Sequence, residues 1–332
     1  MNLLWVQSGG CGGCTLSWLG SELGPLLPTL ADEGIELLWH PSLSESTGAE
    51  ALALLGACAR GERGLDILCV EGAMLRGPRG TGAFHRFAGT GEPAIEWVAR
   101  LAARARHVVA VGSCAAFGGV TSAGTNPTDA CGLQYDGTVR GGLLGTAFAD
   151  RCGLPVINVA GCPTHPDWVT ETLIMLARGE MGAAQLDEFA RPRFYADHLV
   201  HHGCSRNEFY EFKASAERPS DQGCLMENLG CKGTQAHADC NLRPWNGGGS
   251  CITGGFPCIR CTEPGFEEPG HPFARTPKVA GIPIGLPADM PKAWFVALAA
   301  LSKSATPARV RENALADHVV VGPGTARQVR RR

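Results

Sequence analysis

The first half of the chain alternates between short apolar runs and longer segments with helical spacing of apolar residues. Five runs have the length and hydrophobicity of buried strands: Leu3–Gln7, Ile35–His40, Leu65–Val70, His107–Gly112 and Pro155–Ala160. Crossover helices are predicted over Glu50–Arg60, Pro93–Arg106 and Asp167–Arg178. Strands that alternate with helices in this way predict an open α/β sheet. Such sheets bind their ligands at the carboxyl ends of the strands.

Four cysteines stand directly after predicted strands, in glycine-rich loops. They are Cys11, Cys14, Cys114 and Cys162. Because parallel strands end at one edge of the sheet, we expect the four thiols to converge there. Convergent thiolates suit a tetrahedral zinc ion or a [4Fe–4S] cluster. A single cysteine at a strand end would more often be a small buried hydrophobic residue.

A carboxylate is expected at the same edge. Glu71 follows the third predicted strand in Val70-Glu71-Gly72. It is interpreted either as a solvated loop residue or as a polar group, or proton carrier, beside a cluster. Its position relative to the thiols decides between the two interpretations.

From about Gly179 the strand-length apolar runs vanish, and cysteine, glycine and asparagine become frequent. Two more sets of potential ligands follow: His201 with Cys204, Cys224 and Cys231, and then Cys240, Cys251, Cys258 and Cys261. Metal–thiolate bonds can supply the folding energy that such a segment lacks. His198 and His202 compete with His201, but the spacing His201-x-x-Cys204 favours His201.

Structural zinc would explain one isolated C-x-x-C pair. Three four-ligand sets in one chain instead indicate an electron relay, and their spacing lacks the paired motifs of a zinc ribbon. A histidine in place of one cysteine should raise the potential of a cluster, which suits the end of a relay. Of the 15 cysteines, four remain outside these sets. Cys58 and Cys69 are expected in the core, and Cys131 and Cys152 are unassigned.

Composition narrows the class of protein. Charged residues make up 18% of 332 residues, against about 25% in typical domains, which indicates a surface covered by a partner. The net charge of −3 argues against nucleic acid as that partner. No apolar stretch approaches the ~18 residues of a membrane span. Without a recognisable leader, a cytoplasmic location is expected, where thiols stay reduced.

The ordered motifs resemble the small subunit of [NiFe] hydrogenases from residue 1 to about 265. The motifs are Gly10-Cys11-Gly12-Gly13-Cys14-Thr15, Val70-Glu71-Gly72, Gly112-Ser113-Cys114-Ala115, Gly161-Cys162-Pro163, His201-x-x-Cys204 and Pro257-Cys258-Ile259-Arg260-Cys261. The resemblance implies a flavodoxin-like, doubly wound parallel sheet over residues 1–178. A small irregular iron–sulfur cluster-binding domain would follow over 179–282. It also implies a large subunit whose Ni–Fe site splits H₂.

The resemblance implies three clusters in series. The Cys11 set would hold the proximal cluster, the Cys240 set the medial cluster and the His201 set the distal cluster. Many members have proline and a [3Fe–4S] cluster where this chain has Cys251, so three [4Fe–4S] clusters are expected here. Oxygen-tolerant members carry additional cysteines at positions that look like Gly13 and Gly119, which predicts an ordinary proximal cluster. Gly10 replaces the usual glutamate.

The chain looks most like the cytosolic regulatory, H₂-sensing type, and the alternative is an uptake type that delivers electrons to a respiratory carrier. A related quinone-reductase subunit would lack the ligands of the second half. Residues 283–332 carry eight basic and three acidic residues, or +5, which leaves about −8 on the rest. This basic C-terminal extension, with a short helix over Ala293–Leu301, is interpreted as a disordered tail or as a docking arm for a sensor kinase or a second heterodimer.

Overall fold

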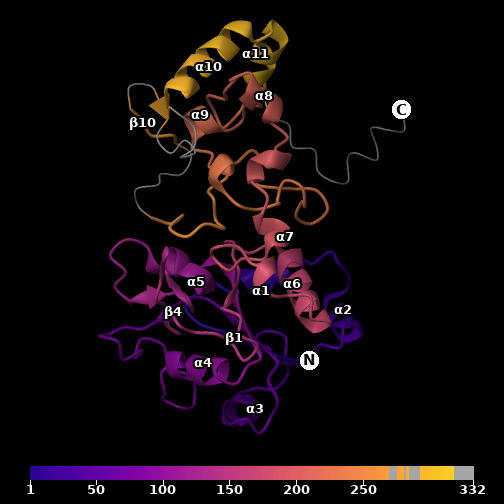
Figure 1. The fold of residues 1–332 in the computed structure, drawn as a ribbon, viewed down its shortest axis with the longest axis vertical. Helices are drawn as coiled ribbons and strands as arrows, with labels where there is room; N and C mark the ends of the chain where they lie inside the picture. The colour runs from indigo at the N-terminus through magenta and orange to yellow at the C-terminus, as the bar shows by residue number, and fades with distance from the viewer. Residues whose placement is uncertain (269–274, 280–281, 284–291, 318–332) are drawn as a thin grey trace. The chain divides into compact units, whose positions relative to one another are not determined.

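The computed structural model describes residues 1–268, 275–279, 282–283 and 292–317. The chain divides into two compact units (Figure 1). Unit 1 comprises residues 1–194 with 261–268, and unit 2 comprises residues 195–260 with the described residues beyond 274. Each unit has its own architecture.

Unit 1 is built on a parallel sheet of five strands: β1 (Asn2–Gln7), β2 (Glu36–Trp39), β3 (Ile67–Glu71), β5 (His107–Val111) and β9 (Ile157–Val159). The strand order is β2-β1-β3-β5-β9, and every neighbouring pair is parallel. This is the flavodoxin-like order, whose switch point lies between β1 and β3. The predicted fold class is confirmed, and each predicted strand is present.

The helices of unit 1 form two groups (Figure 1). Their bounds are α1 Gly13–Trp18, α2 Leu26–Asp32, α3 Gly48–Arg60, α4 Ala94–Ala102, α5 Gly112–Phe117 and α6 Pro166–Arg178. Helices α1 and α2 pack against α6, whereas α3 packs against α4. Helix α6 ends at Gly179, whose positive φ of 70° suits a residue without a Cβ atom.

Short elements complete unit 1. They are β4 Met74–Leu75 with β6 Ala130–Cys131, β7 Tyr135–Asp136 with β8 Val139–Arg140, and the 3₁₀ turns Gly119–Ser122 and Ala183–Gln185. All residues of β3 and β5 are buried, which matches their continuous apolar runs. Cys58 and Cys69 are buried as expected, and Cys131 is buried as well.

The division between the units falls later than residue 178. The backbone amide of Asn158 in β9 donates to Ala190 O at 2.8 Å, and its side chain donates to Phe189 O at 2.7 Å. These bonds hold residues 179–194 at the edge of the sheet. The buried Arg191 donates to Glu263 at 2.8 Å, which holds residues 261–268 in the same unit.

Unit 2 is irregular, as its composition predicts. Its elements are α8 Asn207–Glu211, α9 Met226–Leu229, α10 Lys292–Ala305, α11 Ala308–Ala314, β10 Lys278–Val279, β11 Ile282–Pro283 and the 3₁₀ turns Val200–Gly203 and Gly233–Gln235. The short α7, Arg193–Ala196, contains the point of division. Its apolar clusters are small; one consists of Ala216, Leu225 and Leu229.

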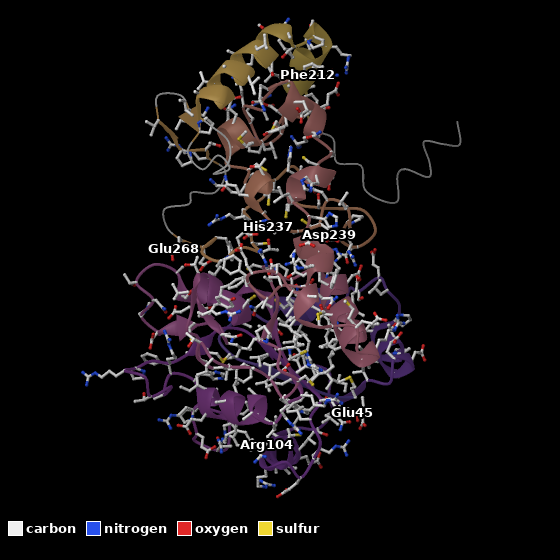
Figure 2. The ribbon with its side chains drawn as sticks, viewed as in Figure 1. Glu45, Arg104, Phe212, His237, Asp239 and Glu268 are labelled. Carbon is white, nitrogen blue, oxygen red and sulfur yellow. The ribbon has the colours of Figure 1, made fainter. Side chains whose placement is uncertain are left out.

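The described part of the C-terminal extension is folded into unit 2. The predicted helix is present within α10. Val310 and Ala314 of α11 are buried against Ala214, with Phe212 beside them (Figure 2). The amide of Gly223 donates to Ala314 O at 2.9 Å. The interpretation as a disordered tail is therefore wrong for residues 292–317, because α11 supplies core residues. The basic end Arg327–Arg332 lies outside the described residues.

Candidate functional site

The proximal set gathers at the carboxyl edge of the sheet in unit 1. Cys11 precedes α1, Cys14 lies in α1, Cys114 lies in α5 directly after β5, and Cys162 follows β9. Gly112 makes this approach possible: a Cβ atom built on it would lie 2.4 Å from the Cys14 sulfur. The backbone of Gly112 has a φ of +83°, which side chains rarely adopt.

The four thiols interact electrostatically. Burial, together with charge on Cys114 and Cys11, raises the pKa of Cys162 to about 11. Burial also raises the pKa values of Cys14 and Cys114. The amide of Thr164 donates to the Cys14 sulfur and lowers that pKa in part. Thiols that share a half-buried site and repel one another as thiolates require a cation or a cluster to hold them deprotonated.

Glu71 is buried at the end of β3 and anchors the first cysteine loop. Its Oε1 accepts the backbone amides of Cys14 at 3.0 Å and Thr15 at 3.1 Å. Its Oε2 accepts the side chains of Gln7 at 2.9 Å, Trp5 at 3.2 Å and Thr15 at 2.5 Å. Five donors around one carboxylate leave it acceptor-only. The interpretation of Glu71 as a solvated loop residue is wrong.

A neutral histidine completes this network. His40 is fully buried, and burial lowers its pKa to about 4, although the charge of Glu71 opposes the shift. Its Nδ1 accepts the amide of Ser42 at 3.0 Å, so Nε2 carries the proton and faces the Thr15 hydroxyl at 3.3 Å. The Thr15 hydroxyl in turn donates a hydrogen bond to Glu71. The orientation of α1, and of Cys14 within it, thus depends on buried polar contacts.

The distal set lines one cavity in unit 2. The lining includes all four predicted ligands: His201, Cys204, Cys224 and Cys231. Burial raises the pKa of Cys224 to about 12, and charge on Cys231 and Cys204 acts in the same direction. His202 is exposed, and neither His202 nor His198 is among the lining residues. Of the three candidate histidines, His201 is the one that lines this cavity.

Arg206 is a site residue that the sequence did not reveal. It is buried and lines the same cavity. Its Nη1 donates to Asp221 O and Gly223 O, each at 2.7 Å, whereas Nε and Nη2 have no hydrogen-bond partner. Burial lowers its pKa, and the three neighbouring thiols oppose that shift. A buried cation with unused donors beside three thiols fits an anionic group in the cavity.

The structure gives fewer contacts for the medial set than for the proximal and distal sets. Cys240, Cys251 and Cys258 lie in loops of unit 2, and Cys261 is counted with unit 1. The amide of Arg260 faces the Cys258 sulfur at 3.4 Å. The hydroxyl of Ser113 donates to the carbonyl of Cys261. The gathering of these four cysteines around one cluster stays a prediction.

The spread of the ligands distinguishes a cluster from a single ion. Tetrahedral zinc with Zn–S bonds of about 2.3 Å holds its sulfurs about 3.8 Å apart. Among the described residues, no three ligand atoms of the proximal or distal set all lie within 4.8 Å of one another. A cubane binds each thiolate at a different iron, so it accepts a wider set. The proximal and distal residues therefore fit an iron–sulfur cluster.

Two family models match the chain. Residues 11–176 match "NADH ubiquinone oxidoreductase, 20 Kd subunit", and residues 196–274 match the C-terminal model of the "NiFe/NiFeSe hydrogenase small subunit". The part of the chain that the structure describes contains no helix long and apolar enough to cross a membrane.

Two relatives are similar in sequence over most of the chain. The F420 non-reducing hydrogenase II small subunit of Methanosarcina mazei is 34% identical over 294 residues, which cover 82% of this chain and 74% of that protein. The periplasmic [NiFeSe] hydrogenase small subunit of Desulfomicrobium baculatum is 32% identical, and the match covers 82% of this chain and 86% of that protein.

Solved structures agree. The actinobacterial-type NiFe-hydrogenase of Ralstonia eutropha superimposes with a TM-score of 0.75 at 29% identity, over 97% of this chain and 95% of that one. The [NiFeSe] hydrogenase of Desulfovibrio vulgaris Hildenborough gives a TM-score of 0.68 at 27% identity, over 82% of this chain and 97% of that one. With these matches across both units, the chain belongs to the small subunits of [NiFe] hydrogenases.

Proposed function

We propose that this chain relays electrons from H₂ oxidation, at a Ni–Fe site on the large subunit, through three [4Fe–4S] clusters. The proximal, medial and distal sets would hold these clusters in that order. The observation that carries the proposal is the presence of two separate four-ligand sites in one chain, the proximal thiols and the distal cavity. A structural role needs one site, whereas electron transfer over a distance needs several.

Unit 1 offers a docking surface for the large subunit. A small subunit of a hydrogenase implies such a partner. Leu16 of α1 is 72% exposed, Leu19 directly after α1 is 50% exposed, and Leu27 of α2 is 53% exposed. Val120, six residues after Cys114, is 58% exposed, and Cys11 is exposed too. Exposed large apolar side chains on α1, which carries Cys14, and on segments near the other proximal cysteines are typical of a surface that a partner covers.

Glu71 is better explained as an anchor of the proximal loop than as a proton carrier. A proton carrier must exchange its proton with a neighbour, whereas the Glu71 carboxylate is held by five donors. The amide bonds to Cys14 and Thr15 fix the start of α1. We propose that Glu71 positions Cys14 for the cluster.

The H₂-sensing type stays the proposed type of this chain, and the uptake type is the alternative. The basic extension gives the sensing type modest support, because it could dock a sensor kinase or a second heterodimer. Val310 and Ala314 of that extension are core residues of unit 2. Turnover with a redox dye, compared with capture of a histidine kinase, separates the two types, because a sensor turns over slowly and binds its kinase.

A cytoplasmic location remains part of the proposal. Some relatives are named as periplasmic, including the small subunit of D. baculatum, so kinship leaves the compartment open. Cell fractionation with antibodies against this chain tests the location directly.

Electron paramagnetic resonance of the purified heterodimer, before and after H₂, tests the relay. Three [4Fe–4S] clusters predict about twelve iron atoms in this chain and reduced-cluster signals after H₂. With Cys251 as a fourth medial ligand, no signal of an oxidised [3Fe–4S] cluster should appear before H₂. A colourless protein with stoichiometric zinc would overturn the proposal.

A further inference from the structure

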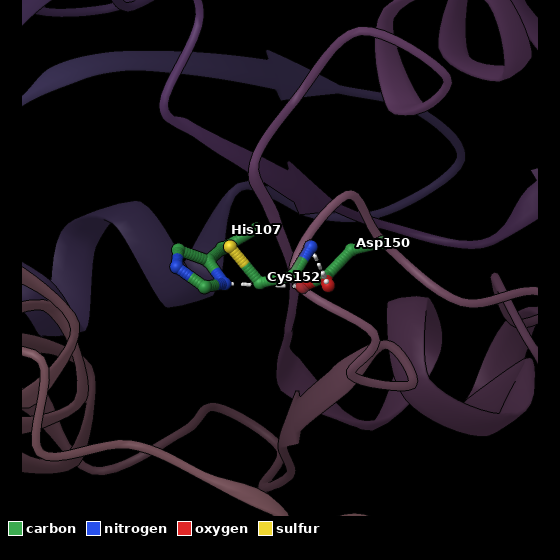
Figure 3. A group of neighbouring side chains, drawn as sticks. All are labelled: His107, Asp150 and Cys152. Atoms are coloured by element: carbon green, nitrogen blue, oxygen red, sulfur yellow. Dashed lines mark hydrogen bonds and ion pairs between the residues drawn. The ribbon is translucent and has the colours of Figure 1, made fainter.

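A second group of ligand-type side chains lies in unit 1, away from the clusters. His107 begins β5, and Asp150 and Cys152 lie in the loop that leads to β9 (Figure 3). One ligand atom from each residue lies within 4.8 Å of the other two. Among the described residues, no other trio of histidine, cysteine or acidic side chains meets this criterion.

The group lies at the opposite edge of the sheet from the proximal set. His107 is the first residue of β5, whereas Cys114 follows the end of that strand. In a parallel sheet, the amino and carboxyl ends of the strands form separate edges. The relay therefore leaves these three side chains without a function, and Cys152 has no assignment from the sequence.

Asp150 is held rigidly. Its side chain is fully buried, and Oδ1 accepts the amides of Cys152 at 2.9 Å and Leu154 at 2.8 Å. Its Oδ2 lies 3.1 Å from Nδ1 of His107, whose side chain is about nine-tenths buried. The dashed lines in Figure 3 join the carboxylate to the imidazole ring and to the Cys152 backbone amide. Two of the three groups are thus preorganised by packing and hydrogen bonds.

Cys152 is the solvent-exposed member of the group. The residue is exposed, so its thiol reaches solvent while His107 and Asp150 face it from inside. A buried His–Asp pair alone would explain how the loop is fixed to β5. It does not require a thiol beside the pair, and an exposed thiol gives an ion both a route of entry and room for a water ligand.

The geometry points to a site for one divalent ion of the zinc class, bound by His107, Asp150 and Cys152. Imidazole, carboxylate and thiolate together are typical zinc ligands, with bonds of about 2.0–2.3 Å. Tetrahedral coordination at those lengths places ligand atoms about 3.4–3.8 Å apart. The three ligand atoms lie within 4.8 Å of one another, so small side-chain movements would bring them to this spacing. Water would take the fourth position.

Zinc retention by the intact, cluster-loaded heterodimer tests the site. The protein is washed with chelator, given a small excess of ZnCl₂, desalted and analysed for zinc and iron together. The wild type should keep one more zinc per heterodimer than Cys152→Ser, with equal iron in both. Glu50→Gln, which alters an exposed carboxylate on α3, should behave like the wild type.

Alkylation provides a second readout, which does not depend on zinc surviving the chelator wash and desalting. Peptide mass spectrometry follows iodoacetamide labelling of Cys152, which zinc should slow in the wild type. Equal zinc in the wild type and Cys152→Ser, or labelling at the same rate with and without zinc, overturns the site. Both outcomes leave the relay untouched, because iron content is measured in the same samples.

Discussion

The Oε1 atom of Glu71 accepts the backbone amide of Cys14 at 3.0 Å, so the end of β3 holds the loop that presents two proximal thiols. The same oxygen accepts the amide of Thr15. The carboxyl edge of the sheet therefore supplies the proximal ligands and also the group that orients one of them. Groups of this kind commonly matter almost as much as the ligands themselves.

Glu71→Gln should impair the proximal cluster. An amide in this position turns one acceptor into a donor, which then faces the donors of Trp5, Gln7 or Thr15. Unsatisfied buried donors cost about 1–3 kcal/mol each. We expect a lower melting temperature and a weaker proximal-cluster signal in electron paramagnetic resonance.

The control for this variant is Glu50→Gln, an exposed change on α3, which should be silent. A proton-carrier role would give a different result for Glu71→Gln. Iron content and the cluster signals would then stay at wild-type levels, and only H/D exchange activity would fall.

The charge of Arg206 should set the potential of the distal cluster. Removing a nearby cation makes a cluster harder to reduce. At an effective dielectric constant near 20, such an interaction amounts to about 1.4 kcal/mol or more, which is about 60 mV for one electron. Arg206→Met should therefore lower the distal potential by about that amount in a redox titration.

Arg206→Lys separates charge from structure. Both substitutions lose the paired bonds to Asp221 O and Gly223 O, so both should destabilise unit 2. Only the methionine variant loses the charge. If the lysine and methionine variants shift the potential equally, the hydrogen bonds rather than the charge set it.

His201 is predicted to be the only histidine ligand of the distal cluster. His201→Cys would add a thiolate, and we expect the cluster to be retained with a lower potential. His201→Ala should reduce the iron content, because it removes a ligand. His202→Ala is the matched control, since His202 is exposed. Loss of iron in the His202 variant alone would reverse the assignment.

Acid should destabilise unit 1 through His40. Its pKa is about 4 in the folded protein because of burial and about 6.5 when unfolded. The unfolded state therefore binds more protons between those values. Stability is unaffected above pH ~6.5 and falls below it, by at most about 1.4 kcal/mol per pH unit.

Melting temperatures by circular dichroism from pH 7.5 to 5 measure this effect. His40→Gln is neutral throughout, so its melting temperature should fall less steeply with acid than that of the wild type. Parallel slopes for the two proteins would place the acid-sensitive group elsewhere.

The sequence predicted the sheet well because buried parallel strands are continuous apolar runs, and β3 and β5 are buried along their whole length. The positions of Cys114 and Cys162 followed from those strands. Arg206 could not be predicted, because it stands between Ser205 and Asn207 like any surface arginine. Its burial depends on carbonyls 15 and 17 residues away, which no local pattern specifies.

The C-terminal extension shows the same limit. A count of charges over residues 283–332 predicts a solvated basic tail. The burial of Val310 arises from contacts with Ala214, almost a hundred residues earlier in the chain. Apolar residues in a short helix identify neither their partner nor their degree of burial.

Helix α11 should be required for the distal site. Val310 is fully buried, and Gly223, next to Cys224, bonds to the α11 carbonyl of Ala314 at 2.9 Å. Val310→Asp would bury an unpaired charge at a cost of about 3–5 kcal/mol. We expect loss of the distal-cluster signal and a lower melting temperature.

Val296→Asp makes the same substitution on α10, where the side chain is 46% exposed. It should leave both properties near wild type, because water solvates the carboxylate. The proximal-cluster signal should survive in both variants, since its ligands lie in unit 1. A distal signal of full intensity in the Val310 variant would mean that the distal site does not depend on α11. The buried charge would then have been accommodated without moving Gly223.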